Sequence, residues 1–270
     1  GLDDINQVDR ITVPWERLPA KLAALFGVSQ GVSLRSLAKN MIGKIDIGVP
    51  EPMELKPPIY KRKFYLKDPS KIKCYNHHLS HAASAYFTSY SSEPCLIFTI
   101  DGSGDNVCTG IYYGEDNRIN KLESFYKDGA LGWPYSLVTE AVGWIHGDGE
   151  GKLMGLAPYG DYSECEGLLD NYFPRFEGKK LVKPSMISTP GYWEEKAALQ
   201  FQIDEADEVA ELVNKYGKEA VAAEAQRVLE ENTLNLVEGW LAEKPVKRIA
   251  FAGGVILNVK LNQKVWYAFK

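Results

Sequence analysis

The sequence predicts an α/β protein built around a mixed sheet, and three observations support this fold class. Short apolar runs with strand character occur at residues 95–102 and 247–252. Residues 204–243 instead show helical spacing of apolar side chains, and a Gly-Gly pair joins the last strand to another helical stretch at 255–269. Two strands joined by a tight turn at 106–126 would run antiparallel to each other. Combined with strands that alternate with helices, they predict a mixed sheet.

The first third of the chain predicts few regular elements. A short strand is expected at 8–14 and an amphipathic helix at 17–27. Residues 48–70 contain five prolines without periodicity and indicate an irregular connection. A second strand at 71–76 leads directly into a helix that Asn76 could cap.

The middle of the chain begins with the strand at 95–102 and the strand pair at 106–126, which turns at Glu-Asp-Asn. A helix is expected at 134–145, because Pro134 suits a first helical turn. The glycine-rich residues 146–160 predict a flexible loop.

After this loop, residues 161–203 are rich in aromatics and prolines and are interpreted as an irregular insertion. Two helices hinged near Gly217 should follow, and Ala225, Leu229, Leu236 and Trp240 mark the apolar stripe of the second.

Composition limits the classes of partner. A chain of 270 residues with 45% hydrophobic and 25% charged residues is ordinary for a globular protein. The net charge of −5 argues against a nucleic-acid partner, because neutralising phosphates requires a basic surface. The basic stretch at 56–73 is interpreted as a solvated loop, or alternatively as a patch for an anionic substrate or partner.

Cysteine usage and hydropathy predict a cytoplasmic protein without a membrane partner. The four cysteines show neither CxxC spacing nor the density of a disulfide framework, which fits a reducing compartment. No apolar run reaches the roughly 18 residues of a membrane span.

The histidines of "NHHLSHAASAY" are candidate metal ligands. In a helix His77 and His81 lie on one face, where two imidazoles can bind one cation. Asp101, at the end of a buried strand, is the natural third ligand, and this donor set suits iron(II), manganese or zinc. The alternative is that His77 and His78 are exposed residues at the helix start and that His81 is an ordinary polar neighbour.

Two glycine-rich turns are candidate phosphate sites. Residues 101–105 could bring backbone N–H groups close to phosphate oxygens, or simply form a hairpin turn. Gly253 and Gly254 could form a tight turn, or a bed for a nucleotide whose phosphates face a helix N-terminus. Lys152 could neutralise a phosphate, although a lone exposed lysine is the commoner case.

Four segments in order, "NHHLSHAASAY", "TIDGSGD", "EGKLMGLAPYG" and "AGGVILNVKLNQ", resemble the successive signatures of the NodU/CmcH/TobZ carbamoyltransferases. The resemblance covers residues 76–263 and implies an actin/sugar-kinase-like ATPase fold with ribonuclease-H-like halves, similar to the enzyme that attaches threonylcarbamoyl to tRNA adenosine. The implied reaction moves a carbamoyl group from carbamoyl adenylate, made from carbamoyl phosphate and ATP, to a hydroxyl of a sugar or natural-product acceptor.

The same resemblance implies site residues. Iron(II), or another divalent metal, is expected on His77, His81 and Asp101. No residue is singled out as the catalytic base. The expected contacts to ATP or carbamoyl adenylate are Gly102, Ser103, Gly104, Lys152, Gly253, Gly254 and Asn258.

Departures from the family pattern predict a fragment truncated at both ends. We expect residues 1–92 to be the remainder of the first ribonuclease-H-like half and 93–270 an incomplete second half, with the insertion near 161–203. A later aspartate ligand and an adenylating carboxyl-terminal domain are expected outside this chain, so the fragment alone should be inactive and bind metal weakly.

Two alternatives remain open from the sequence. One is another enzyme of the ATPase superfamily, a sugar kinase or the tRNA-modifying relative, and the other is a non-catalytic nucleotide-binding scaffold. The aromatic side chains of the insertion could stack on a sugar or belong to the core. They are Tyr162, Tyr172, Phe173, Tyr192 and Trp193.

Overall fold

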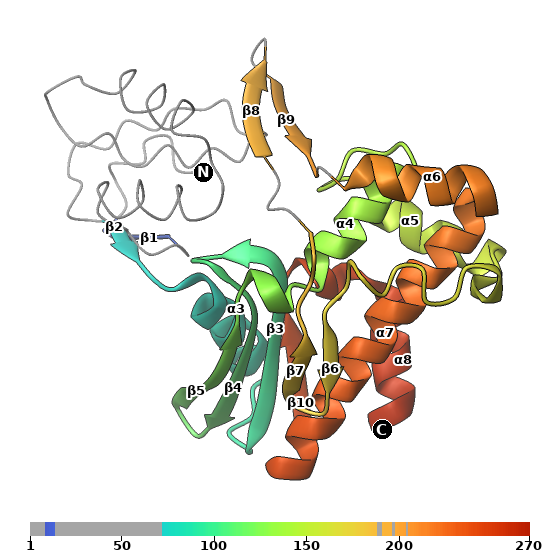
Figure 1. Cartoon of the computed structure of the whole chain (residues 1–270). Helices are drawn as coiled ribbons and strands as arrows, with labels where there is room; N and C mark the ends of the chain where they lie inside the picture. Colours follow the sequence, from blue (N-terminus) through green and yellow to red (C-terminus); the bar gives the residue numbers. More distant parts are fainter. Residues whose placement is uncertain (1–8, 14–71, 188–190, 196–197, 204) are drawn as a thin grey trace, which may run out of the picture. The chain divides into compact units, whose positions relative to one another are not determined.

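The computed structural model describes residues 9–13, 72–187, 191–195, 198–203 and 205–270 (Figure 1). The chain forms two compact units, Gly1–Asn76 with Gly191–Gln200, and His77–Pro190 with Phe201–Lys270. The helix expected at 17–27 and the irregular connection at 48–70 lie outside the described residues, as does most of the basic stretch.

A four-stranded mixed sheet organises the larger unit. Its strands are β3 (Cys95–Gly104), β4 (Val107–Glu115), β5 (Arg118–Phe125) and β10 (Arg248–Ala252), in the order β10-β3-β4-β5. The pairs β3–β4 and β4–β5 are antiparallel, whereas β10 runs parallel to β3. The mixed sheet and the α/β class are thus confirmed, as are all four strands.

Helices pack on both faces of this sheet because β3 is apolar on both sides (Figure 1). On one face Cys95 and Ile97 contact Ala82 and Tyr86 of helix α3 (His77–Phe87). On the other, the alternate residues of β3 join a larger core with the remaining helices. Strand residues buried on both faces give the continuous apolar run seen in the sequence.

The larger core beside the second face is built by helices that come from both sides of the insertion. These are α4 (Gly132–Ala141), α5 (Glu150–Leu156), α6 (Ala206–Tyr216), α7 (Lys218–Glu243) and α8 (Val259–Phe269). The hinge between α6 and α7 is confirmed at Gly217, whose φ of 85° favours glycine. The predicted stripe of α7 is buried, from Ala225 to Trp240.

Two boundaries differ from the prediction. Helix α4 begins at Gly132 and ends at Ala141, before Gly143 with its φ of 95°. The stretch at 146–160 is not a flexible loop throughout, since α5 and a 3-10 helix at Ala157–Tyr159 occupy much of it. The reason is Glu150, whose carboxylate accepts hydrogen bonds from the Ser136 hydroxyl at 2.7 Å and the Gly147 N–H at 2.8 Å.

The insertion is more regular than predicted. It contains two two-stranded sheets, β6 (Arg175–Glu177) with β7 (Lys180–Lys183) and β8 (Gly191–Glu195) with β9 (Ala198–Gln202). The first sheet packs on α7, where the Phe176 N–H donates to Asn232 Oδ1 at 3.0 Å. These strands are too short for a periodicity to be visible in the sequence.

The smaller unit contains a second described strand pair besides most of β8–β9. Strands β1 (Ile11–Val13) and β2 (Ile72–Cys74) pair in parallel, which confirms both predicted strands.

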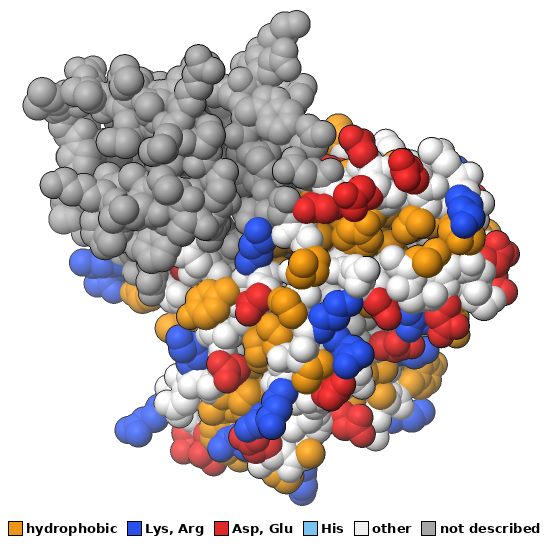
Figure 2. Space-filling view, in the orientation of Figure 1, with side chains coloured by type: hydrophobic (Ala, Val, Ile, Leu, Met, Phe, Trp, Pro, Cys, Tyr) orange, Lys and Arg blue, Asp and Glu red, His pale blue; other side chains and the backbone are white. Residues whose placement is uncertain are grey.

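No helix in the described ranges has both the length and the apolarity needed to cross a membrane. Acidic, basic and hydrophobic side chains are interspersed over the described part of the face in Figure 2.

Candidate metal centre

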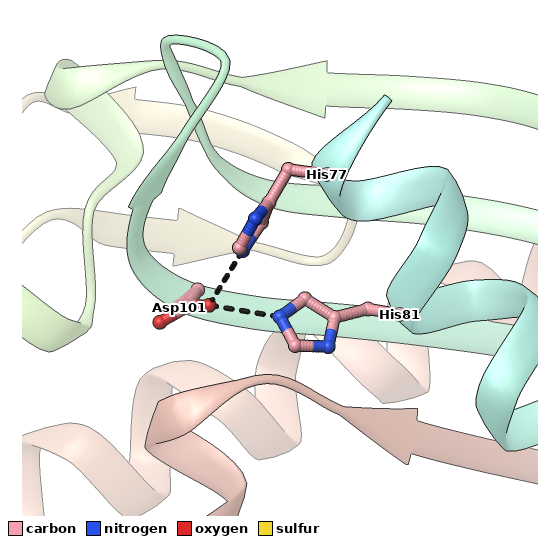
Figure 3. Close-up of side chains that lie close together, drawn as sticks. All are labelled: His77, His81 and Asp101. Carbon is pink, nitrogen blue, oxygen red and sulfur yellow. Dashed lines mark hydrogen bonds and ion pairs between the residues drawn. The ribbon is translucent and has the colours of Figure 1, made fainter. Parts of the chain in front are cut away.

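Helix α3 and strand β3 bring two histidines and an aspartate together (Figure 3). His77 and His81 lie one turn apart, and the Nε2 atom of each is 3.0 Å from the same atom, Oδ2 of Asp101. Within the described ranges these residues form the one group of three or more His, Cys, Asp or Glu side chains whose potential ligand atoms all lie within 4.8 Å of one another. The structure therefore brings together all three residues predicted as ligands.

An irregularity in β3 places Asp101. The pairing of β3 with β4 shifts register between Ile100 and Gly104, as in a β-bulge, which turns side chains out of the regular alternation. The Gly102 N–H donates to Asp101 Oδ1 at 2.8 Å, leaving Oδ2 toward the histidines. Asp101 is thus held by its own strand before any ligand is considered.

The surroundings keep Asp101 ionised. Burial alone would raise its pKa, but hydrogen bonds from the two histidines and from the Gly102 N–H outweigh burial and hold the pKa well below its usual value. Since a carboxylate only accepts, each histidine Nε2 is the donor in this arrangement. The triad thus has two imidazole N–H groups directed at one carboxylate oxygen.

His78 has a different role from its neighbours. Its side chain is fully buried, with Nδ1 2.8 Å from Thr99 Oγ1 and Nε2 2.8 Å from the Val107 carbonyl oxygen. Burial lowers its pKa, so the ring is neutral and Nε2 donates to the carbonyl. The alternative that His77 and His78 are exposed residues at a helix start is therefore wrong, because both rings pack against the β3–β4 hairpin.

Three of the predicted glycines permit close approaches at the triad or beside it. A Cβ atom on Gly104 would lie 2.0 Å from the His77 ring, and one on Gly254 would lie 2.9 Å from Asp101 Oδ1. Gly253 has a φ of 105° and approaches the Ile100 carbonyl so closely that a Cβ would be 2.2 Å from its oxygen. Glycine is required there for backbone conformation and close approach together.

The other predicted contacts lie in different settings. Gly102 packs beside the Trp133 ring, and Ser103 is exposed. Lys152 is exposed on α5 and makes no hydrogen bond or ion pair with the triad in the described part of the chain. Asn258 caps α8 by accepting the Leu261 N–H at 2.9 Å.

The amide of Asn258 also serves the core. It exchanges hydrogen bonds with the buried Gln226 of α7, at 2.9 Å and 3.1 Å. Gln226 in turn accepts from the Tyr135 hydroxyl at 2.9 Å. This network fixes the start of α8, which follows the Gly253–Gly254 turn in the chain.

The donor set fits a divalent metal. Two imidazole nitrogens and one carboxylate oxygen are the ligands of facial sites that leave other positions open, most familiarly for iron(II). Gly104 and Gly254 let the His77 ring and the Asp101 carboxylate lie close to the backbone, where a Cβ atom would collide with them. The residues present therefore fit a metal with open coordination positions.

One supporting contact was not predictable from the sequence. Asp105 Oδ2 accepts the backbone N–H of His77 at 2.7 Å, across 28 residues. Asp and Asn in "GDN" do indicate a turn with positive φ. Nothing in the sequence, however, indicates which distant N–H the Asp105 carboxylate would meet.

Comparisons with known proteins point to one family. The family model described as carbamoyltransferase N-terminus matches residues 35–268. The uncharacterized protein MJ1058 of Methanocaldococcus jannaschii is 30% identical over 219 residues, covering 76% of this chain and 34% of the relative. The nodulation protein NolNO of Sinorhizobium fredii is 31% identical over 210 residues, covering 73% of this chain and 28% of that protein.

A third relative extends this pattern. The nodulation protein NolO of Bradyrhizobium diazoefficiens is 28% identical over 204 residues, covering 72% of this chain and 33% of the relative. The chain thus spans about a third of the length of the curated relatives it matches. Because the family model covers most of the sequence, including the triad, the chain belongs to the family of carbamoyltransferase N-terminal regions.

Proposed function

We propose that this chain is the part of an O-carbamoyltransferase in which a carbamoyl group passes to an acceptor hydroxyl beside a metal held by His77, His81 and Asp101. The observation that carries the proposal is the convergence of both Nε2 atoms on Asp101 Oδ2, at 3.0 Å, in a chain of the carbamoyltransferase family. A scaffold protein has no need of two imidazoles aimed at one carboxylate oxygen.

The sheet supports a ribonuclease-H-like half within an ATPase-like fold. Such a half starts with an antiparallel three-stranded meander, and its fourth strand then pairs in parallel with the first. The meander β3-β4-β5 and the parallel strand β10 beside β3 have this arrangement. In this proposal the two glycine turns, after β3 and after β10, lie at the same edge and receive the nucleotide.

In the proposed site, the chain's residues would bind the metal, balance its charge and lie against the carbamoyl donor. Iron(II), the metal proposed, would act there as a Lewis acid for a carbonyl or phosphoryl oxygen. His77 and His81 would each present Nε2 once its proton moves to Nδ1, and the ionised Asp101 balances the charge. Gly253 and Gly254, which lie against Ile100 and Asp101, are proposed to face carbamoyl adenylate with their backbone.

The acceptor is proposed to be a sugar or natural-product hydroxyl. Of the insertion's aromatics whose side chains are described, Phe173 is buried in the core and Tyr172 packs against it. Tyr162 is 43% exposed, with the Arg227 guanidinium 5.6 Å from its ring centroid. Tyr162 therefore retains a surface on which a sugar could stack.

Formation of the adenylate belongs elsewhere in this proposal. The relatives have about two thirds of their length outside the matched region. An adenylating domain that uses carbamoyl phosphate and ATP would lie in such a region. The 270 residues alone are then expected to bind the donor without completing the overall reaction.

The test is binding of an unreactive carbamoyl adenylate analogue, in which a sulfamate replaces the phosphate. Isothermal titration of the chain should show binding that is about tenfold tighter with iron(II) than without it. The His77→Ala/His81→Ala variant should lose this difference, because the metal no longer stays in place. Gly254→Ala, whose methyl group would lie 2.9 Å from Asp101 Oδ1, should weaken binding of the analogue as well.

The same titration separates the competing activities. Equal binding of the analogue to the parent and to the double histidine variant would contradict the proposal. Tight binding of ATP together with a free sugar, independent of the histidines, would favour a kinase. If neither the analogue nor ATP binds, with or without iron(II), a non-catalytic scaffold would be favoured.

A further inference from the structure

We propose that Asp105, in the β3–β4 turn, is a positioning residue that sets the histidine pair against Asp101. The inference rests on the proposed function, since it concerns the same metal centre. Asp105 contributes no atom to the group of ligands formed by His77, His81 and Asp101. Its effect is exerted through the first residue of α3.

The contact that carries the proposal joins the turn to the helix N-terminus. Asp105 Oδ2 accepts the His77 N–H at 2.7 Å, a short charge-assisted hydrogen bond. The N–H groups of a first helical turn have no partner within the helix, and a carboxylate there also interacts favourably with the helix dipole. Asp105 therefore fixes the residue that carries the first ligand.

The turn places Asp105 in the left-handed region of the backbone. Asp105 and Asn106 are successive non-glycine residues with φ of 50° and 69°. Positive φ is uncommon outside glycine, and Asp and Asn adopt it more readily than other residues with side chains. Gly104 and Val107 pair on either side, which makes this a two-residue hairpin turn. Glycine would also suit this turn, but only a side chain such as that of Asp105 can accept the His77 N–H.

The same turn also contacts α3 through its two flanking residues. Gly104 lies under the His77 ring, where a Cβ would be 2.0 Å away, and the Val107 carbonyl accepts the His78 Nε2–H at 2.8 Å. Contacts to two successive helical residues determine the rotation of the helix about its axis. They also determine where His81, one turn later, points.

The experiment compares identical substitutions in two adjacent hairpin turns. Asp105→Gly removes the carboxylate and relieves the positive φ. Asp116→Gly makes the same change at a φ of 53° in the β4–β5 turn. Asp116 is engaged there through its backbone, by the Ser92 carbonyl and the Tyr86 hydroxyl. Its carboxylate has no contact with the triad among the described interactions, so Asp116→Gly controls for glycine in a hairpin.

Anaerobic iron(II) titration provides the first result. Asp105→Gly should weaken iron(II) binding about tenfold, as loss of a supporting partner typically does, while Asp116→Gly should bind like the parent. Asp105→Asn keeps an acceptor oxygen and tolerates positive φ, so it should recover most of the affinity. Equal affinity of the two glycine variants would overturn the proposal.

A second readout does not depend on the metal. In the metal-free chain, the imidazole nitrogen NMR signals of His77 and His81 report their hydrogen bonds to Asp101. Asp105→Gly should shift the His77 signal toward that of an unbonded imidazole, and Asp116→Gly should leave it in place. If the parent binds no iron(II), the proposed metal is wrong, and the NMR comparison alone decides whether Asp105 positions the triad. An unchanged His77 signal in Asp105→Gly would then reject the inference.

Discussion

At the scale of single residues, the candidate metal centre depends on glycine as much as on its ligands. Gly104 allows the His77 ring to lie directly against the strand backbone, and Gly254 does the same for Asp101. Both close approaches are incompatible with a Cβ atom at ordinary distances. Substitutions at these glycines should therefore move a ligand.

Gly104→Ala tests this directly. Its methyl group would lie 2.0 Å from the His77 ring, so the ring or the strand must shift, at a cost of about 1–3 kcal/mol in the free energy of unfolding. The affinity of this variant for iron(II) should fall together with its free energy of unfolding. The matched control is Gly102→Ala, whose methyl group meets the Trp133 ring at an ordinary 3.5 Å. Urea unfolding and metal titration of both variants check the prediction, and equal losses would contradict it.

The buried thiols make a second prediction at this scale. Burial raises the pKa of Cys95 and Cys165 to about 11 and that of Cys108 to about 12. At about pH 8 they should therefore remain thiols and react slowly with iodoacetamide. Peptide mass spectrometry of the native chain should find them unlabelled, and denaturation should expose them. Fast native labelling of Cys108 would contradict the buried position of β4.

At the scale of elements, helix α7 is the principal support of the larger unit. Its buried Glu224 accepts the Gly167 N–H at 2.7 Å and two bonds from the Arg227 guanidinium, each at 2.7 Å. Arg227 also pairs with Glu231 at 2.6 Å. These contacts attach the first part of the insertion to the helix.

Glu224→Ala should destabilise the chain by about 3 kcal/mol, because it leaves a largely buried guanidinium with less compensation and an N–H without its acceptor. Glu231→Ala is the control, since that carboxylate is 57% exposed and should contribute less than about 1 kcal/mol. Thermal and urea unfolding of the two variants measure the difference. Similar losses in both would show that burial of Glu224 has no special importance.

The elements themselves were largely predictable from the sequence. The short continuous apolar runs of β3 and β10, bounded by turn residues, and the helical stripe of α7 located these elements in the sequence. The boundaries of α4 and the start of α5 were not predictable in the same way. They depend on contacts such as Glu150 with Ser136, which form only after the chain folds.

The hairpin β6–β7 illustrates a different limit. Its strands have three and four residues, and its stability comes from packing on α7 and from the Asn232 contact. Such short strands have no alternation that distinguishes them from a loop. Tertiary packing, which the sequence does not display, makes them regular.

At the scale of the whole molecule, the triad joins segments that are distant in the chain. Helical spacing placed His77 and His81 on one face, and the end of a strand suggested Asp101, 24 residues beyond His77. Their convergence was predictable from spacing and resemblance together. The contributions of Thr99 and Asp105 were not, because a hydrogen-bond partner across 21 or 28 residues depends on how the hairpin meets the helix. The roles of His77, His81 and Asp101 as metal ligands remain predictions.

Anaerobic titration of iron(II) into the parent and into His77→Ala/His81→Ala tests whether His77, His81 and Asp101 bind a metal in this chain, with Leu79→Ala of the same helix as control. We expect the parent and Leu79→Ala each to bind one equivalent and the double variant to bind none. Equal binding in all three proteins, or no binding in any of them, would contradict metal binding by these residues.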